Sequence, residues 1–212
     1  MLTSLNQMTV ATEHHSPIAL DAELLEQQLR QEDALLRGHF RLSSGLHSDT
    51  YVQCARFLRR PELAAPAAAA LAGQLQAAGW QPDVVVGPAM GGVVIGYELA
   101  RQLGVPGIFT ERDADGQMTL RRGFTIEPGE RVVIAEDVVT TGKSTLEVAK
   151  VLRAMGAEVL AVASLIDRTG GEGGLDFPHF ALLSVRAATF APEDCPLCAA
   201  GVPVVKPGSR PG

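Results

Sequence analysis

The sequence predicts an α/β fold in which helices cover both faces of a parallel sheet. After residue 80, short continuous runs of Val, Ile and Ala alternate with amphipathic segments, and Gly-rich or polar turns separate them. Strands of a parallel sheet are buried on both faces, so they read as continuous apolar runs. The 212 residues are 46% hydrophobic and 20% charged, which favours one domain with an ample core.

Three elements are expected before this alternating region. Apolar residues at helical spacing predict a helix that begins with Asp21 as its N-cap and ends at Gly38. Residues 40–54, FRLSSGLHSDTYVQC, read as two short strands around a Ser/Gly turn. The alanine-rich stretch 61–79 predicts a helix that Gly79 closes.

The alternating region predicts the sheet itself. The expected elements are strand 82–87, helix 93–104, strands 107–111 and 131–137, helix 145–156, and strands 158–167 and 180–185. In such sheets, ligands bind at the carboxyl ends of the strands, where loops lead into helices. Two loops at that edge are unusual, namely GPAMGG at 87–92 and EDVVTTGKS at 136–144.

Composition excludes some classes of function. The formal net charge of −6 argues against general nucleic-acid binding, which needs a basic face, but it allows a local site for a small polyanion. No apolar run reaches the length of a membrane span. Residues 1–17 lack the pattern of a signal peptide, so we expect a cytoplasmic protein with a disordered tail at 1–16.

The cysteines do not suggest a disulfide framework, because their number is small and odd. The chain contains Cys54, Cys195 and Cys198. The segment CPLC, at 195–198, has the spacing of a metal knuckle, but a four-ligand zinc site needs two further ligands. A second subunit or His179 could supply them, although we expect reduced, unliganded thiols. His39 and His47 are scattered in the sequence, and structural roles are expected for both.

Residues 132–145, VVIAEDVVTTGKST, end like a loop that grips a nucleoside triphosphate. Such a loop requires a glycine five residues before its Gly-Lys pair, and that position holds Asp137. A carboxylate there would repel the β-phosphate. The triphosphate interpretation is therefore excluded.

The same loop suits a ribose 5-phosphate. A helix is expected at its end, and the unpaired N–H groups of a helix N-terminus favour a phosphate. Glu136 and Asp137 stand about a sugar's length upstream, where carboxylates can accept hydrogen bonds from vicinal hydroxyls. Further contacts to the phosphate can come from Thr140, Thr141, Gly142 and Ser144. Each residue alone could be a cap or a turn residue, but their order after a buried strand favours the ligand site.

The other loop, GPAMGG, again places glycines between a strand and a helix. The glycines at 87, 91 and 92 permit backbone amides to face an anion. Beside a ribose-phosphate loop, this pattern indicates a second anion such as pyrophosphate.

These segments resemble a known family. VVIAEDVVTTGKST resembles the phosphoribosyl diphosphate (PRPP) signature of the type I phosphoribosyltransferases. Between about residues 20 and 207 the chain resembles the orotate phosphoribosyltransferases among them. FRLSSGLHSDTYVQ is similar to their N-terminal hood, GPAMGG to their pyrophosphate loop, and SLIDR to the strand end whose arginine meets orotate.

The resemblance implies the type I phosphoribosyltransferase fold, a parallel sheet core with a small hood. It places the N-terminal helix and hood strands in 17–60, the core in 61–194 and a C-terminal tail with CPLC in 195–212. It further implies a homodimer in which a flexible loop of one subunit completes the site of the other.

The resemblance also implies a reaction: transfer of ribose 5-phosphate from PRPP to orotate, giving orotidine 5′-monophosphate and pyrophosphate in pyrimidine synthesis. Mg²⁺ accompanies PRPP and is held mainly by PRPP and water, without protein ligands. A purine phosphoribosyltransferase is one alternative, against which stand the hood and Arg168. A PRPP-sensing regulator without turnover is the other, since the flexible loop departs from the family pattern.

The site residues implied by the resemblance fall into three groups. PRPP contacts are expected from Glu136, Asp137, Val138, Val139, Thr140, Thr141, Gly142, Lys143, Ser144, Met90, Gly91, Arg112 and Arg41. Orotate contacts are expected from Thr140, Arg168 and Tyr51. Catalytic roles are expected for Asp137, which favours positive charge on the ribose, and for Arg112 and Arg121, which stabilise departing pyrophosphate. Arg112 is expected to act on the site of the partner subunit.

The chain departs from the family in the flexible loop. Residues 109–126, FTERDADGQMTLRRGFTI, contain no lysine or histidine, whereas the family commonly has both there. DADG predicts a hairpin turn that returns Arg121 and Arg122 opposite Arg112, and these arginines would replace the missing basic residues. The alternative is a surface hairpin with solvated arginines.

Three positions differ in single residues. Gly91 and Arg41 each stand where many members have a lysine. Lys143 replaces a small residue, and it either contacts phosphate or points to solvent.

Overall fold

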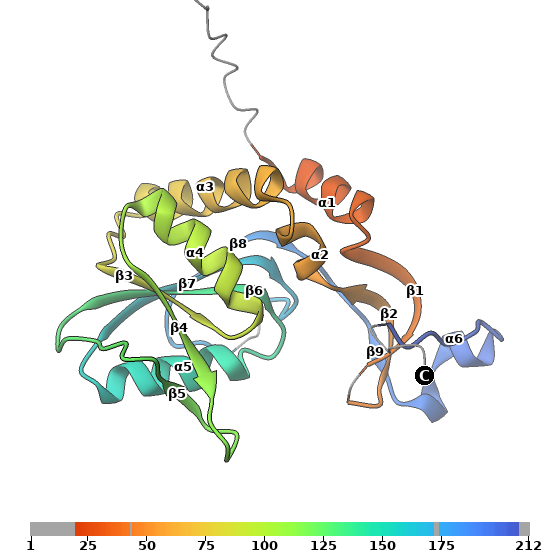
Figure 1. Cartoon of the computed structure of the whole chain (residues 1–212). Coiled ribbons are helices and arrows are strands. Elements are labelled where there is room, and N and C mark those ends of the chain that lie inside the picture. The colour runs from red at the N-terminus through yellow and green to blue at the C-terminus, as the bar shows by residue number, and fades with distance from the viewer. Residues whose placement is uncertain (1–19, 43, 172–173, 208–212) are drawn as a thin grey trace, which may run out of the picture.

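A computed structural model describes residues 20–42, 44–171 and 174–207, which form two sheets and a layer of helices on each face of the larger sheet (Figure 1). The strands are β1 (Leu35–Arg41), β2 (His47–Val52), β3 (Val84–Pro88), β4 (Gly107–Arg112), β5 (Met118–Leu120), β6 (Arg131–Val139), β7 (Glu158–Asp167), β8 (His179–Ser184) and β9 (Thr189–Phe190). The helices are α1 (Ala22–Gln31), α2 (Cys54–Leu58), α3 (Pro61–Ala77), α4 (Gly91–Leu103), α5 (Lys143–Ala154) and α6 (Pro196–Ala199), with a 3₁₀ turn at Pro192–Asp194. The tail expected at 1–16 lies outside the described residues.

The larger sheet has the strand order β5-β4-β3-β6-β7-β8. All of its pairs are parallel except β4 with β5, so the predicted parallel sheet is confirmed and gains one antiparallel edge strand. Its strands alternate between two cores: Val85 and Val133 pack on the side of α3 and α4, while Val84 and Ile134 pack on the side of α5. The continuous apolar runs thus reflect burial on both faces.

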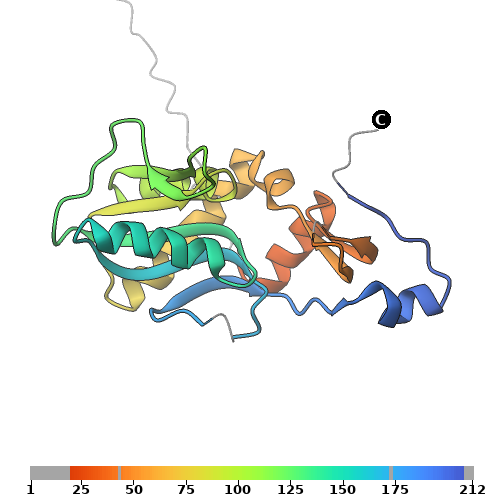
Figure 2. The ribbon, with the colours of Figure 1, turned by 90° about the horizontal axis from the view of Figure 1, so that it is seen from below.

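The helix layers are plain in two views. In Figure 1, α3 and α4 lie above the sheet and α5 below it. Figure 2 shows α5 along the sheet and the C-terminal segment passing around the outside of the smaller sheet. Within the described ranges, no helix combines the length and apolarity needed to span a bilayer.

The first helix is shorter than expected. Its N-cap is confirmed, since the N–H of Leu24 donates to Asp21 Oδ1 at 2.8 Å. Its predicted end at Gly38 is wrong, because Asp33 adopts a left-handed φ of 50° and turns the chain out of the helix. Residues 35–41 then form β1, where Leu35 and Phe40 are buried. The spacing of these apolar residues fits a helix equally well, so sequence periodicity alone could not distinguish a helix from a strand.

The smaller sheet, called the hood from here on, consists of β1, β2 and β9. The two strands predicted around the Ser/Gly turn are confirmed as the antiparallel pair β1 and β2, and β9 adds to the free edge of β2. The chain end also returns to the hood: Val205 bridges to Phe40, and the N–H of Val205 donates to the carbonyl of His39 at 2.8 Å. Segments about 150 residues apart in sequence therefore share this sheet.

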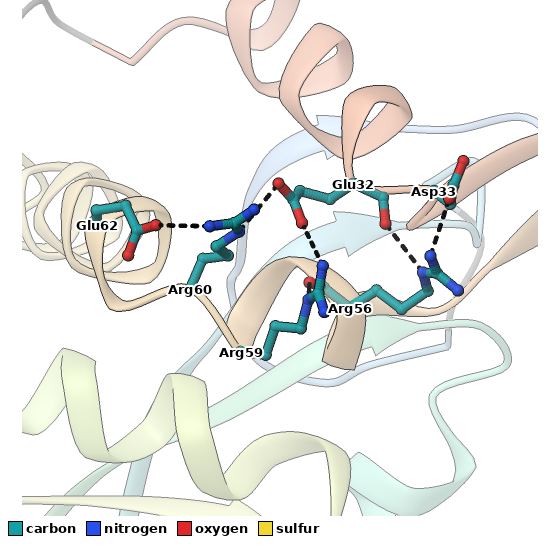
Figure 3. Close-up of polar contacts among 6 residues, drawn as sticks. All are labelled: Glu32, Asp33, Arg56, Arg59, Arg60 and Glu62. Carbon is teal, nitrogen blue, oxygen red and sulfur yellow. Dashed lines mark hydrogen bonds and ion pairs between the residues drawn. The ribbon is translucent and has the colours of Figure 1, made fainter.

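An ion-pair network fastens the beginning of the hood to the helical layer (Figure 3). Glu32 pairs with Arg59 at 3.0 Å and with Arg60 at 3.1 Å. Arg56 pairs with Asp33 at 2.8 Å and donates from Nε to the carbonyl of Glu32 at 3.0 Å. Exposed pairs contribute little individually, but this network fixes where the chain leaves α1 and enters β1.

Two glycines bring α4 close to the sheet. A Cβ on Gly87 would stand 2.3 Å from the carbonyl oxygen of Gly92, and a Cβ on Gly92 would stand 2.5 Å from that of Ala135. Any side chain at either position would collide with backbone. The close approach places the start of α4 beside the carboxyl ends of β3 and β6, where ligands bind in parallel sheets.

Candidate functional site

A cavity of about 650 Å³ lies between the hood and the carboxyl ends of the core strands. Arg41 and Tyr51 line it from the hood, and Thr140 and Arg168 line it from the core. The structure therefore brings together all of the residues expected to contact orotate, along with Arg41. Lys206 also lines this cavity and was missed by the sequence analysis.

Lys206 is brought to the cavity by backbone pairing that the sequence around it does not predict. It stands alone in a Pro/Gly-rich stretch, VPVVKPGSRPG, which carries no strand or helix period. The N–H of Arg41 donates to the carbonyl of Val205 at 2.8 Å, which places residue 206 beside the end of β1. A third cation thus joins Arg41 and Arg168 at the cavity wall.

Arg168 follows directly after β7, and its backbone N–H donates to the carbonyl of Val139 at 2.8 Å. Its Nε is buried and has no hydrogen-bond partner among the described residues. Burial lowers the pKa of the guanidinium, and the nearby charge of Asp49 opposes that effect. A buried donor without a partner implies a ligand or water that accepts its hydrogen bond.

The turn that carries Arg168 is held by its neighbour. Asp167 is buried, and its Oδ1 accepts a hydrogen bond from the N–H of Thr169 at 2.7 Å. Asp167 therefore supports the end of β7.

A smaller hollow of about 40 Å³ is formed by the loop between β6 and α5. Gly142, the N-cap of α5, has a left-handed φ of 74°, a conformation that side-chain-bearing residues rarely adopt. The backbone N–H groups of the first turn of α5 therefore open toward the loop. Thr140 and Thr141 line both this hollow and the large cavity, so a phosphate in one would lie beside a ligand in the other.

The two acids occupy successive positions of β6 and lean toward opposite faces of the sheet. Glu136 lines the hollow on the α5 side, whereas Asp137 lies against the start of α4. The N–H of Val138 donates to Asp137 Oδ1 at 2.8 Å. Asp137 thus lies between the loop after β3 and the loop after β6. Glu136, unlike Asp137, lines the hollow.

Burial changes the titration of both carboxyls. Glu136 has 8% of its surface exposed, and burial together with the charge of Asp137 raises its pKa to about 8. Burial also raises the pKa of Asp137, partly offset by hydrogen bonds from the backbone. In the ligand-free protein near neutral pH, Glu136 is mostly protonated and can donate as well as accept a hydrogen bond.

Of the three glycines in the loop between β3 and α4, only Gly91 is exposed. Gly87 and Gly92 are required by backbone packing, as described above. Gly91 is exposed and borders Asp137, while Met90 before it is 80% exposed. The segment around Met90 and Gly91 is therefore the exposed part of this loop, and the contact of the loop amides with an anion stays a prediction.

The hairpin predicted from DADG is confirmed as β4 and β5, but its register differs from the expected one. Arg112 pairs with Met118, because β5 ends at Leu120. Arg121 and Arg122 lie beyond the strand and form ion pairs with Glu111 at 3.3 Å and 2.6 Å. The prediction that these two arginines stand opposite Arg112 is wrong.

Arg112 is held within its own chain by two contacts. It donates to Glu147 on α5 at 2.5 Å and to the carbonyl of Gly116 at 2.7 Å. The hairpin projects below the sheet in Figure 1, apart from the hood. In the part of the chain that the structure describes, neither cavity is lined by Arg112, Arg121 or Arg122.

The histidines do not follow the sequence expectation. His179 Nε2 lies 2.8 Å from Ser164 Oγ, so its suggested role beside CPLC is wrong. His39 and His47, expected to be scattered, instead lie together with Cys195 and Cys198. The reason is the folding of the C-terminal segment onto β1.

Comparisons with known proteins agree with this geometry. The family model described as "Phosphoribosyl transferase domain" matches residues 55–196. Over 180 residues the chain is 53% identical to an orotate phosphoribosyltransferase of Carboxydothermus hydrogenoformans, covering 85% of this chain and 94% of that protein.

Solved structures agree on the fold. The structure of orotate phosphoribosyltransferase from Aeropyrum pernix superposes with a TM-score of 0.61 at 28% identity, covering 76% of this chain and 93% of the other. An adenine phosphoribosyltransferase from Thermoanaerobacter pseudethanolicus gives 0.57 at 19% identity, covering 64% and 88%, a likeness of fold alone.

Proposed function

Since the chain belongs to the orotate phosphoribosyltransferase family, we propose that it transfers ribose 5-phosphate from PRPP to N1 of orotate, in the de novo synthesis of UMP. The products are orotidine 5′-monophosphate and pyrophosphate. One observation carries the assignment of the site. The cavity that is lined by Arg168, whose buried Nε has no partner among the described residues, shares Thr140 and Thr141 with the hollow at the start of α5.

The 5-phosphate binds in the hollow between β6 and α5. Backbone N–H groups from the first turn of α5 and the hydroxyls of Thr140, Thr141 and Ser144 donate to its oxygens. The positive end of the helix dipole adds to this attraction. Lys143 is exposed at the same turn and supplies a solvent-side charge.

The ribose lies above the end of β6. As the C1′–O bond to pyrophosphate breaks, positive charge develops on the ring and negative charge on the leaving group. Asp137 stabilises the positive charge and holds a ring hydroxyl, and Glu136 orients the sugar from the other side of the strand. N1 of orotate attacks C1′ and loses its proton to water or to an oxygen of the departing pyrophosphate, while the electrons of the C1′–O bond leave with pyrophosphate.

Orotate occupies the large cavity under the hood. The guanidinium of Arg168 meets its carboxylate or a ring carbonyl with two parallel donors, a geometry that an ammonium group cannot copy. Tyr51 covers the ring, and Lys206 adds its positive charge to that of Arg41 at the rim. An anionic base fits this wall better than a neutral purine does.

The carboxylates and the loop oxygens around β6 suit Mg²⁺ bound with PRPP, because this ion prefers oxygen donors and keeps several waters. When bound, it supplies charge neutralisation of the pyrophosphate group. Pyrophosphate itself lies along the segment around Met90 and Gly91, next to Asp137.

A homodimer completes the site in this proposal. Arg112 and Arg121 lie on or next to the β4–β5 hairpin and line neither cavity of their own chain, as expected of residues that serve a neighbouring subunit. Arginines there neutralise pyrophosphate but cannot act as general acids near neutral pH. The proposal includes a cytoplasmic location, since the highly charged PRPP does not cross membranes.

The test is an assay with PRPP, Mg²⁺ and orotate, following the loss of orotate absorbance together with pyrophosphate release. Adenine, hypoxanthine, xanthine and uracil serve as parallel acceptors. Turnover with orotate alone is expected. Turnover with a purine would overturn the assignment of the acceptor, and PRPP binding without turnover on any base would favour a PRPP-sensing regulator.

A further inference from the structure

The reaction leaves one group of side chains without a role. His39 and His47 on β1 and β2, with Cys195 and Cys198 at the two ends of CPLC, each present one ligand atom, and these atoms lie within 4.8 Å of one another. The cysteines are about 150 residues from the histidines in sequence. Their convergence results from the return of the C-terminal segment to the hood.

The distances between these atoms are close to the edges of a tetrahedron around one metal ion. His39 Nε2 lies 2.9 Å from His47 Nδ1 and 3.5 Å from Cys195 Sγ, and Cys198 Sγ lies 3.3 Å from His47 Nδ1. Zinc bonds of about 2.0–2.3 Å in a tetrahedral site give ligand–ligand separations of about 3.3–3.8 Å. Small adjustments of side-chain torsion would therefore suffice to accept the ion.

The outer ring nitrogen of His39 fixes the tautomer that a metal requires. His39 Nδ1 lies 2.8 Å from the carbonyl oxygen of Val202, an acceptor only, so Nδ1 carries the proton. Nε2 is then unprotonated and directs its lone pair into the cluster. A backbone carbonyl that orients a histidine in this way is the usual second partner of a metal-bound imidazole.

The donor set selects the ion. Two thiols and two imidazoles with Cys-x₂-Cys spacing favour Zn²⁺ over Mg²⁺ or Ca²⁺, which prefer oxygen. His39, His47 and Cys195 are buried, and four protein ligands leave no open position for a substrate. These features are typical of structural zinc sites.

We propose that His39, His47, Cys195 and Cys198 bind one structural zinc ion that fastens the C-terminal segment to the hood. The consequence for the active site is local. Val205, the residue before Lys206, pairs with β1 next to His39, so the ion holds Lys206 and Arg41 at the rim of the orotate cavity. The site is separate from the Mg²⁺ that accompanies PRPP.

The first experiment measures metal in the full-length protein purified without chelators, by inductively coupled plasma mass spectrometry. We expect about one zinc ion per chain. Cys198→Ser and His47→Ala should lose it. Cys54→Ala and His179→Ala are matched controls, because Cys54 and His179 lie outside the cluster, and they should retain the wild-type zinc content.

Measurements on the wild-type protein cover the case in which a variant fails to fold. A mercurial thiol reagent should release zinc in step with modification of two thiols, and cobalt added after chelation should give the visible absorption of tetrahedral Co²⁺ and a thiolate charge-transfer band. Chelation should lower the apparent melting temperature by about 10 °C and raise the KM for orotate more than that for PRPP.

Zinc-free protein that neither takes up cobalt nor changes its melting temperature with added zinc would overturn the proposal. So would a disulfide between Cys195 and Cys198 in freshly purified protein, detected by mass spectrometry. The zinc stoichiometry does not depend on which base is the acceptor, so failure of this proposal and failure of the proposed function are separable.

Discussion

The carboxylate of Asp137 lies where a side chain at position 91 would begin: a Cβ built on Gly91 would stand 2.5 Å from Asp137 Oδ1. This contact joins the start of α4 to the end of β6, so the two segments proposed to bind PRPP meet at one carboxylate. Because Gly91 has no side chain, the carboxylate of Asp137 occupies this space.

Gly91→Ala is therefore expected to reduce activity without unfolding the protein. The Cβ would push Asp137 out of its position, and we expect kcat/KM for PRPP to fall about tenfold or more, comparable to the loss of one positioned electrostatic group. Folding stability should hold, since alanine in the first turn of a helix is more favourable than glycine by about 0.5–1 kcal/mol. Steady-state kinetics and thermal unfolding measure the two effects.

Gly73→Ala is the matched control. Gly73 lies inside α3, and a Cβ there meets nothing within 4 Å. This variant should gain a similar small stability and keep wild-type kinetics. Equal kinetics for Gly91→Ala and the wild-type protein would show that Asp137 does not depend on the space at position 91.

Glu136 is expected to make stability fall as pH rises. Its pKa is about 8 in the folded protein against 4.5 in an unfolded chain. Between these values the folded state keeps a proton that the unfolded state has lost, so the free energy of unfolding decreases with pH across this window and levels off above it. The decrease should be on the order of a few kcal/mol, since each unit of pKa shift corresponds to about 1.4 kcal/mol before relaxation.

Glu136→Gln should flatten this dependence, because the neutral amide does not titrate. Chemical denaturation at pH values from 5 to 9 gives the comparison, and Glu23→Gln, at an exposed position of α1, should keep the wild-type slope. Asp83, whose pKa is lowered to about 2 by Arg131, contributes the opposite slope only below its ordinary pKa of 3.8. An identical decline in Glu136→Gln would assign the slope to another group.

Sequence patterns captured the core of this fold because its strands are buried on both faces and its loops carry the chemistry. The apolar runs that end at Val86 and Asp137 are short and rich in β-branched residues, so they predict buried strands rather than helices. The end of α1 was misread because residues 35–41 fit both periods, and only pairing with β2 decides between helix and strand. A local sequence pattern cannot distinguish helix from strand where pairing with another segment decides between them.

The same limit explains what was missed at the hood. Lys206 and the pair of histidines gain their positions from the return of the C-terminal segment to β1, a contact across about 160 residues. CPLC signalled half of a metal site, but the spacing of His39 and His47 carries no sign of their partners. Long-range backbone pairing of this kind has no periodicity in sequence.

Lys206→Ala is expected to weaken orotate binding selectively. Lys206 is exposed at the cavity rim, so its charge is partly screened, and we expect the KM for orotate to rise about three- to tenfold. The KM for PRPP should change less, because the phosphate hollow lies on the other side of Thr140 and Thr141. Raising the salt concentration should shrink the difference between variant and wild type.

The comparison for Lys206→Ala is Lys150→Ala, which removes an exposed lysine from α5, outside the residues that line the cavity. Kinetics of this control should match the wild type. A rise in both Michaelis constants for Lys206→Ala would instead indicate that the C-terminal segment had detached from the hood.

A mixing experiment tests whether active sites are shared between subunits. Arg112→Ala and Arg168→Ala should each be nearly inactive alone. In a hybrid dimer, one site has its own Arg168 together with Arg112 of the partner subunit, and random exchange should restore about a quarter of the wild-type activity. Activity is measured after mild denaturation and renaturation of the mixture.

The control mixes Arg168→Ala with the double variant Arg112→Ala/Arg168→Ala, a pair in which every site lacks Arg168, and this mixture should stay inactive. Native mass spectrometry must show that hybrid dimers form in both mixtures. Hybrid dimers without recovered activity would mean that Arg112 serves its own chain. In that case its ion pair with Glu147 would have to open during turnover, and Glu147→Gln should then raise the activity of the wild-type background.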